Sequence, residues 1–378
     1  MKKRICFVVS EIFSARILLK DHIDRLSEDF DVYLVANIPD AQVEIFDDFK
    51  IAGFKSVRIK RKLSIIDDIR SVFVLIRYFN RMNFFAVHSL TPKAGLITAL
   101  ASRISNVPNR IHMFSGQVWY TRTGLFKRIL MFVDQIIVKC NTHNLVDGKT
   151  QRKFLVKHRI LKYTNSIILG AGSITGVSLQ RFTPSADVRK QVRLSLGLRE
   201  DQIVFVFLGR LNRDKGIQEL FEAFDLIYKD NKNVYLLLIG PDEENCLNNI
   251  YDYAHLIPGV NMAFFGYTLT PERLLQAGDV FCLPSYREGF GQSVIEASCL
   301  GLPVICSDTY GIMDAMVDDV TGLRCKVKDV ESLYQQMLRL SDDSELRRTL
   351  GQNGRQRVLD NFSGEAITNA WVEFYRNL

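Results

Sequence analysis

Residues 284–307 read PSYREGFGQSVIEASCLGLPVICS and place two carboxylates, Glu288 and Glu296, around a glycine-rich turn. Gly289 and Gly291 allow the backbone to turn and to approach a ligand without an intervening Cβ. The residues that follow are predicted to form a helix, whose first N–H groups have no partner within the helix and favour an anion such as a diphosphate. The glycines indicate that Glu288 lies in the loop and Glu296 on the helix.

A second motif, FVFLGRLNRDKGIQEL at 205–220, has an apolar strand that ends in Gly209 and is followed by Arg210 and Lys215. Taken alone, these two cations would be read as solvated surface residues. Their position directly after a buried strand, where α/β proteins bind ligands, favours a binding role instead. A weaker motif, LLLIGPDEE at 236–244, is a buried strand that also ends in a glycine.

Together these segments resemble retaining glycosyltransferases of family 4, which have the two-domain GT-B fold, and the resemblance runs over almost the whole chain. In that family the cations matching Arg210 and Lys215 neutralise the donor diphosphate, so the resemblance implies that they and Glu288 are catalytic. Glu288 would accept hydrogen bonds from sugar hydroxyls, and Glu296 from the ribose. The donor-binding residues that the resemblance implies are Gly209, Arg210, Lys215, Gly240, Glu288, Gly289, Phe290, Gly291, Ser293, Val294 and Glu296.

Three further segments, HSLTPKAG at 88–95, SGQVW at 115–119 and GSITGV at 172–177, resemble bacterial transferases that build O-antigen or capsule repeat units. The implied reaction moves a hexosyl or N-acetylhexosaminyl group, with retention of configuration, from a UDP-linked donor to a polyprenyl-diphosphate-linked saccharide.

The loop at 115–117 is where many members of this family carry a histidine near the transferred sugar. Here the matching position is Ser115, and the implied acceptor-side residues are Ser115, Gly116 and Gln117. The histidine's role therefore does not carry over. His112, in the strand before this loop, is expected to be a core residue.

No metal cofactor is expected, because Arg210, Lys215 and the helix after Gly291 would stabilise the leaving diphosphate themselves. The stretch Asp29-Phe30-Asp31 spells the D-x-D of metal-dependent sugar transferases, but it lies where a helix enters a strand and is interpreted as coincidence. Two other functions stay open at this point. One is a noncatalytic nucleotide-binding partner at a membrane surface, and the other is a nucleotide-sugar epimerase of the same architecture.

The rest of the chain alternates apolar runs with helical patterns, which predicts two doubly wound α/β domains that face each other across a cleft. Expected strands of the first half are ICFVV at 5–9, DVYLVAN at 31–37, FFAVHS at 84–89, NRIHMF at 109–114 and DQIIVKC at 134–140, and its expected helices lie around 14–27, 64–82, 93–105 and 122–132. Strands of the second half are expected near 203–208, 234–239, 262–265, 280–283, 303–306 and 322–326.

The predicted boundaries are an acceptor-binding domain at 1–183, a nucleotide-sugar-binding domain at 184–362, and a C-terminal helix at 363–378 that returns to the first domain. The glycine-rich stretch at 170–176 lacks the spacing of a dinucleotide fingerprint and is expected to act as a hinge. The seven cysteines form no C-x-x-C pair, so reduced thiols with packing roles are expected. No run of about 18 apolar residues or signal-like h-region is present, so a cytoplasmic protein is expected.

Positive charge is concentrated in the first half of the chain. Residues 1–180 carry 28 Lys and Arg against 14 Asp and Glu, which leaves 21 against 28 for the remainder. No nucleic-acid-binding signature accompanies this charge, so an anionic membrane is the expected partner. The segments at 58–82 and 123–133 mix basic and apolar residues; most of the apolar ones are expected in the core. Peripheral association with the inner face of the cytoplasmic membrane would then depend on Lys60, Arg61 and Lys62.

Overall fold

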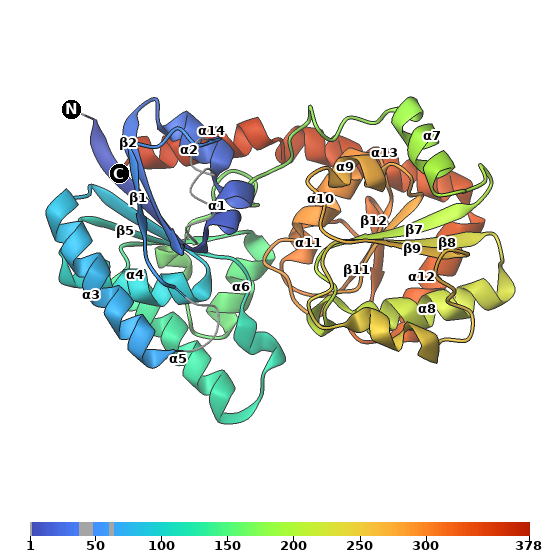
Figure 1. The fold of residues 1–378 in the computed structure, drawn as a ribbon, viewed down its shortest axis with the longest axis horizontal. Helices are drawn as coiled ribbons and strands as arrows, with labels where there is room; N and C mark the ends of the chain where they lie inside the picture. Colours follow the sequence, from blue (N-terminus) through green and yellow to red (C-terminus); the bar gives the residue numbers. More distant parts are fainter. Residues whose placement is uncertain (1, 38–47, 60–63) are drawn as a thin grey trace. The chain divides into compact units, whose positions relative to one another are not determined.

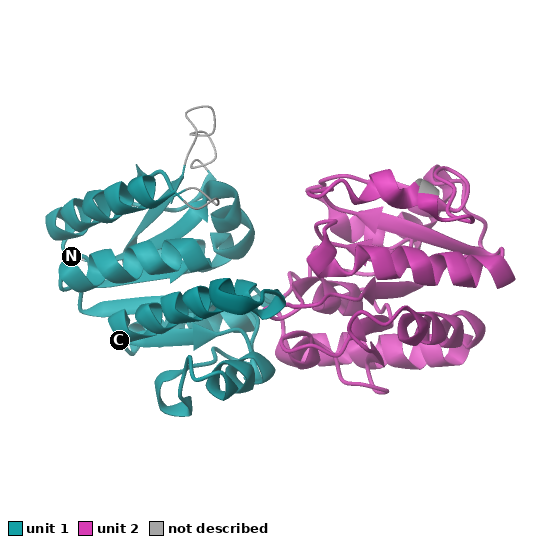
Figure 2. Ribbon diagram, turned by 90° about the horizontal axis from the view of Figure 1, so that it is seen from below, with its two compact units in different colours: residues 1–176, 364–378 teal, residues 177–363 magenta. Residues whose placement is uncertain are grey.

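The computed structural model describes residues 2–37, 48–59 and 64–378, and the chain divides into two compact units (Figure 2). Unit 1 comprises residues 1–176 and 364–378, and unit 2 comprises residues 177–363. The chain therefore passes from unit 1 to unit 2 after residue 176, before the boundary expected at 183. The reason is packing, because Val177 and Phe182 are buried in the core of unit 2.

Unit 1 is built on a six-stranded sheet, in which every pairing is parallel and the strand order is β3-β2-β1-β4-β5-β6 (Figure 1). Its strands are β1 (Lys3–Glu11), β2 (Phe30–Asn37), β3 (Gly53–Ser56), β4 (Ala86–Leu90), β5 (Asn109–Phe114) and β6 (His143–Val146). Its helices are α1 (Ile12–Leu18), α2 (Lys20–Leu26), α3 (Ile65–Met82), α4 (Pro92–Ile104), α5 (Gly124–Cys140), α6 (Lys149–Lys157) and α14 (Gly364–Arg376).

The strand predicted at 134–140 is wrong, because helix α5 continues through it to Cys140 and β6 begins only at His143. A short apolar run fits a buried helix as well as a buried strand. Asp134 and Ile137 are the buried residues of this stretch and lie three residues apart, which is the spacing of one helix face. The helix expected at 14–27 is divided into α1 and α2, which meet at Leu19.

Helix α14 packs on unit 1 beside α1 and α2, on the face of the sheet opposite α3, α4 and α5 (Figure 1). The Trp371 ring stacks against His22 and His88, at centroid distances of 4.5 and 4.9 Å. Arg376 forms an ion pair of 2.6 Å with Asp29, so the first acid of the D-x-D stretch has a structural contact.

Unit 2 repeats the architecture with the parallel order β12-β11-β10-β7-β8-β9. Its strands are β7 (Ile203–Leu208), β8 (Val234–Ile239), β9 (Met262–Phe265), β10 (Val280–Leu283), β11 (Val304–Ser307) and β12 (Gly322–Cys325). Its helices are α7 (Ala186–Ser195), α8 (Ile217–Asp230), α9 (Pro271–Leu275), α10 (Gln292–Cys299), α11 (Ile312–Ala315), α12 (Val330–Asp342) and α13 (Ser344–Asn361). All six strands predicted for this half are confirmed, with ends that differ by a residue at most.

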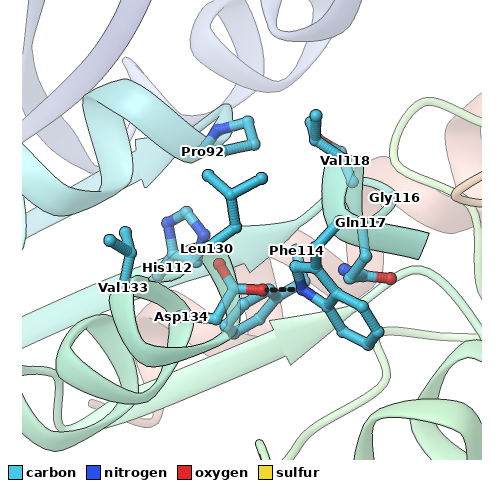
Figure 3. Close-up of a pocket in the computed structure, with 11 residues that line it drawn as sticks. Pro92, His112, Phe114, Gly116, Gln117, Val118, Leu130, Val133 and Asp134 are labelled. Atoms are coloured by element: carbon cyan, nitrogen blue, oxygen red, sulfur yellow. Dashed lines mark hydrogen bonds between the residues drawn. The ribbon is translucent and has the colours of Figure 1, made fainter. Parts of the chain in front are cut away.

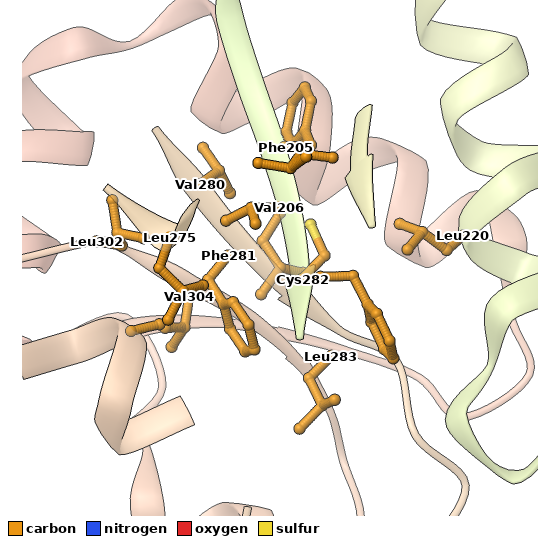
Figure 4. Packing of buried hydrophobic residues seen from close by; sticks show 14 of the residues in the cluster. Phe205, Val206, Leu220, Leu275, Val280, Phe281, Cys282, Leu283, Leu302 and Val304 are labelled. Atoms are coloured by element: carbon orange, nitrogen blue, oxygen red, sulfur yellow. The ribbon is translucent and has the colours of Figure 1, made fainter. Parts of the chain in front are cut away.

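The core of unit 2 is formed by strands buried on both faces. Figure 4 shows side chains of β7, β10 and β11, among them Phe205, Phe281 and Val304, which interdigitate in a fully apolar interior. All seven cysteines are free thiols and five of them are buried, as the scattered spacing predicts. Within the described residues, no helix is both long and apolar enough to span a bilayer.

Both sheets have the strand order of a Rossmann fold, which reverses between β1 and β4 in unit 1 and between β7 and β10 in unit 2. In open parallel sheets, ligands bind beyond the carboxyl ends of the strands at this reversal. The residues that follow β7 and β10 are therefore the expected location of a ligand-binding site.

Candidate active site

The reversal point of unit 2 brings together the residues that the sequence motifs singled out. Arg210 and Lys215 follow β7, and Glu288 follows β10. The Lys215 Nζ atom contacts Glu288 Oε1, and the Ser285 hydroxyl donates a hydrogen bond of 2.9 Å to the same oxygen. The side chains of Lys215 and Glu288 are only 18% and 14% exposed, so burial strengthens their attraction.

The loops after β7 and β10 are locked to each other by their backbones. Gly216 has a φ of 69°, and a Cβ at this position would lie 2.1 Å from the carbonyl oxygen of Pro284. The Tyr286 N–H donates to the carbonyl oxygen of Asp214 at 2.8 Å, and the Arg287 side chain donates to the Asp214 carboxylate at the same distance. Only glycine permits this close approach, which fixes Lys215 next to Glu288.

Arg210 is held by an acid that sequence analysis did not single out. Its guanidinium donates to the two carboxylate oxygens of Glu243 at 2.8 and 3.2 Å, and the Asn212 amide donates to the same carboxylate at 3.3 Å. Glu243 follows β8, the neighbour of β7, and the carboxyl ends of parallel strands share one edge. The acidic residues of GPDEE, directly after a buried strand, could therefore have predicted a partner for Arg210 from the sequence.

Gly240, one of the predicted donor-binding residues, has a packing role in the structure. Its φ is 130°, and a Cβ there would lie 2.0 Å from the carbonyl oxygen of Gly209. The glycine is required for the loops after β7 and β8 to pass each other.

The turn after β10 has the predicted form. Gly291 has a φ of 89° and directly precedes α10, which begins at Gln292, while Glu288 lies in the loop and Glu296 on the helix. The Gln292 amide donates to Glu296 Oε1 at 3.2 Å. Burial is the main cause that raises the pKa of the Glu296 carboxyl, to about 7. The carboxyl can therefore change its charge near neutral pH.

Phe290 and Val294 do not offer their side chains to a ligand. Phe290 is 5% exposed and packs edge-on against Phe362, while Val294 is fully buried in the core of unit 2. Any part they play in donor binding is confined to the main chain. Ser293, between them, is half-buried.

Gly311, which the motifs did not include, supports this turn from the loop after β11. Its φ is 86°, and a Cβ there would lie 2.5 Å from the carbonyl oxygen of Gly289. Glycine at this position therefore lets the loop after β11 pack against the backbone of the glycine-rich turn.

The predicted acceptor-side residues, Ser115, Gly116 and Gln117, follow β5 in unit 1, and Gly116 has a φ of 89°. They line a cavity of about 40 Å³ (Figure 3). Gln117 is buried, whereas Ser115 is half-exposed. The other residues that line the cavity are Pro92, His112, Phe114, Val118, Trp119, Leu130, Val133 and Asp134.

His112 is a core residue, as expected. It is 2% exposed, its Nδ1 lies 2.9 Å from the Ser89 hydroxyl, and its ring meets Phe114 edge-on. Burial lowers the pKa of His112 to about 3, so the imidazole is neutral. A Cβ at Gly95 would lie 2.4 Å from the ring, which shows how tightly α4 packs over it.

Asp134 is the acid of this cavity that sequence analysis missed, because it was assigned to a strand. The Trp119 indole donates to its carboxylate at 2.7 Å, as the dashed line in Figure 3 marks. Burial raises the pKa of Asp134 to about 6. This hydrogen bond ties α5 to the short helical turn at Val118–Thr121, which directly follows Gln117.

Among residues 2–37, 48–59 and 64–378, no three His, Cys, Asp or Glu side chains are grouped so as to hold a metal ion. Arg210, Lys215 and the first turn of α10 are positive groups that follow β7 and β10 at the reversal point of unit 2.

Comparison with known proteins supports one interpretation of this geometry. Residues 188–357 match the family model described as glycosyl transferases group 1. A capsular polysaccharide biosynthesis glycosyltransferase of Staphylococcus aureus, CapM, is 30% identical over 375 residues, which cover 99% of this chain and 96% of that protein. A UDP-Gal:α-D-GlcNAc-diphosphoundecaprenol α-1,3-galactosyltransferase of Escherichia coli is 24% identical, with 89% and 86% covered.

The fold has solved counterparts. A sucrose-phosphate synthase of Thermosynechococcus elongatus superimposes with a TM-score of 0.83 at 21% identity, and the match covers 100% of this chain and 99% of that one. At this identity the likeness shows the fold alone, and it confirms the predicted GT-B class with two Rossmann-like domains.

Proposed function

The chain belongs to the group 1 glycosyl transferases, and we propose that it transfers a hexose or N-acetylhexosamine from a UDP-linked donor to a lipid-linked saccharide, with retention of configuration. The observation that carries the proposal is the meeting of Lys215 and Glu288 at the reversal point of unit 2, with Arg210 on the same loop as Lys215. The assignment to family 4 stays a prediction from the motifs.

The donor diphosphate would be held by exchange of ion-pair partners. Arg210 is paired with Glu243 and Lys215 with Glu288, so both cations are already ordered beyond the carboxyl end of β7. A diphosphate carries more charge than one carboxylate and accepts more hydrogen bonds. It would draw both cations toward it, and Glu288 would then be free to accept from sugar hydroxyls.

Transfer would break the bond between the anomeric carbon and the phosphate oxygen and form one between that carbon and an acceptor hydroxyl oxygen. Arg210, Lys215 and the α10 amides would stabilise the negative charge that grows on the diphosphate. The acceptor proton would pass to the departing phosphate oxygen. Attack on the face that the leaving group vacates retains the configuration without a covalent enzyme intermediate.

These cations would replace a divalent ion, so we propose that the reaction needs no metal. Transfer measured with an excess of chelator should proceed at the uninhibited rate. Loss of activity in chelator, with recovery on addition of manganese, would contradict the proposal and return attention to the Asp29-Phe30-Asp31 stretch.

We propose a polyprenyl-diphosphate-linked saccharide of O-antigen or capsule synthesis as the acceptor, received by unit 1 through Ser115, Gly116 and Gln117. The name of the Escherichia coli relative gives such an acceptor, and that of the Staphylococcus aureus relative gives capsule synthesis. The excess of Lys and Arg in residues 1–180 supports a working place at the anionic inner face of the cytoplasmic membrane. Lys60, Arg61 and Lys62, to which the sequence points for this contact, lie outside the described residues.

The test is a transfer assay in which a panel of sugar nucleotides is paired with polyprenyl-diphosphate saccharides, and the new linkage is read by NMR. We expect one donor to be used and the anomeric configuration to be kept. A changed sugar nucleotide in the absence of acceptor would indicate an epimerase. Nucleotide binding without turnover on any acceptor would indicate a noncatalytic partner.

A further inference from the structure

Helix α3 exposes apolar side chains where the outer helix of an α/β unit normally carries polar ones. Leu75 and Phe79 pack into the core of unit 1, as the sequence predicts. The expectation that most apolar residues of this segment lie in the core is wrong for the outer face of the first half of α3, because Ile65 is 77% and Phe73 64% exposed. The exposed apolar residues of α3 are Ile65, Ile66, Ile69, Phe73 and Val74.

Helix α5 repeats the pattern in its own first half. Ile129 and Phe132 are 49% and 58% exposed. With Leu125 and Phe126 they form a ridge along the outer side of the helix, beside a shallow groove that Lys127, Arg128 and Met131 help to line. We call the exposed apolar residues of α3 and α5 together the α3–α5 surface.

The topology of unit 1 brings the two halves of this surface to one edge. The helices follow the parallel strands β3 and β5, so the first turns of both lie at the carboxyl end of the sheet. In Figure 1, α3, α4 and α5 lie in a row on one face, and α4 contacts both neighbours. The loop with Ser115 and Gln117 leaves β5 at the same edge.

Basic side chains accompany the apolar ones. Arg70, Arg77 and Arg81 are exposed on α3, and Arg128 is exposed on α5. The acids on these helices are engaged within the unit, since Asp68 pairs with Lys93 at 2.9 Å and Asp134 is buried against Trp119. Two copies of this surface would bring arginines face to face, which disfavours self-association, whereas anionic lipid headgroups complement them.

We propose that the α3–α5 surface inserts into an anionic membrane, with its apolar side chains below the headgroups and its arginines among them. The inference rests on the proposed lipid-linked acceptor and adds where and how the enzyme meets the bilayer. Binding by charge alone is released by salt. Binding through inserted apolar side chains persists, because salt screens only the electrostatic part.

The experiment uses the full chain and sedimentation with vesicles of phosphatidylcholine, with or without phosphatidylglycerol. A variant with Ile69→Ser, Phe73→Ser, Ile129→Ser and Phe132→Ser should bind anionic vesicles roughly tenfold or more weakly than wild type. At about 1 M salt, wild type should stay partly bound and the variant should be released. The control, Leu194→Ser with Val260→Ser and Leu269→Ser, removes three apolar residues of unit 2 that are 77%, 61% and 58% exposed, and it should bind as wild type.

Wild-type binding by the α3–α5 variant would overturn the proposal. The proposal would also be overturned if wild type were a dimer that does not bind vesicles and the variant were a monomer. Transfer to a water-soluble, short-chain acceptor separates this inference from the proposed function. If transfer is absent in every protein while the vesicle pattern holds, the proposed function fails and the surface stands. If transfer is equal in every protein but the expected differences in vesicle binding are not seen, the membrane proposal is overturned and the proposed function is unaffected.

Discussion

The Arg210 guanidinium donates hydrogen bonds of 3.2 and 2.8 Å to the two carboxylate oxygens of Glu243, so the cation proposed to bind the donor diphosphate is already paired. Because Arg210 is 46% and Glu243 31% exposed, solvent weakens the pair and an incoming diphosphate can replace it. The acid thus orders the arginine at the edge of the sheet, and it also competes with the nucleotide.

Glu243→Gln should increase the affinity for UDP by roughly tenfold, because it removes a negative charge that competes for Arg210. Calorimetric titration of UDP measures the effect. The matched control is Glu244→Gln, since the Glu244 carboxylate accepts from the Arg213 N–H at 2.8 Å rather than from Arg210. Equal UDP affinity in wild type and Glu243→Gln would show that the pair does not compete with the nucleotide.

Arg210→Ala and Lys215→Ala should each lower turnover by about 10²-fold, the scale expected when a preorganised group facing developing charge is lost. Steady-state transfer assays measure this, with thermal melts to verify that the proteins fold. Arg213→Ala is the control, because Arg213 lies in the same loop and is exposed. Wild-type rates in folded Arg210→Ala or Lys215→Ala would contradict the assigned roles.

Glu296→Gln should weaken UDP binding, whereas Glu288→Gln should leave it nearly unchanged and impair transfer. The reason is that Glu296 is assigned to the ribose and Glu288 to the sugar. Since burial raises the pKa of Glu296 to about 7, wild-type affinity should increase as pH rises through that value and the carboxyl ionises. Glu296→Gln retains every other titrating group and should reduce this pH dependence. An equal loss of affinity in both variants would mean that the two acids are wrongly placed.

Unit 1 should lose stability in mild acid because His22 is buried under α14. Its Nε2 donates to the carbonyl oxygen of Ile174 at 2.7 Å, its Nδ1 lies 2.9 Å from the Thr368 hydroxyl, and its ring stacks on Trp371. Burial lowers the pKa of His22 to about 4, below its usual value in the unfolded chain. The neutral ring therefore stabilises the fold above about pH 6.5, and this stability is lost as pH falls toward 4, at roughly 1.4 kcal/mol per pH unit.

Denaturant titrations at pH 7.5 and pH 5 should show this loss, and His22→Gln should reduce its size. A difference between the two pH values that is the same in wild type and His22→Gln would assign the effect to other groups.

The strand pattern and the motif at 284–307 determined a large part of this protein. Strands β8 and β10 are buried on both faces, and β7 is buried except at its two ends, so each is a continuous apolar run. The same holds for the turn before α10, because Gly291 adopts a φ of 89° that few residues tolerate. Local conformational preference and burial depend directly on the residue sequence. They also predict that Glu288 lies in the loop and Glu296 on the helix.

The tertiary structure decided what depends on contacts between distant segments. The run at 134–140 fits a strand or a helix, and its packing against Trp119 makes it the end of α5. The pairing of Arg210 with Glu243 requires β7 and β8 to be neighbours, and Gly240 is required by the backbone of Gly209. Whether Ile65 and Phe73 are core or surface depends on which face of α3 meets the sheet. Periodicity shows that a helix has an apolar face, but only packing shows which apolar side chains are left outside.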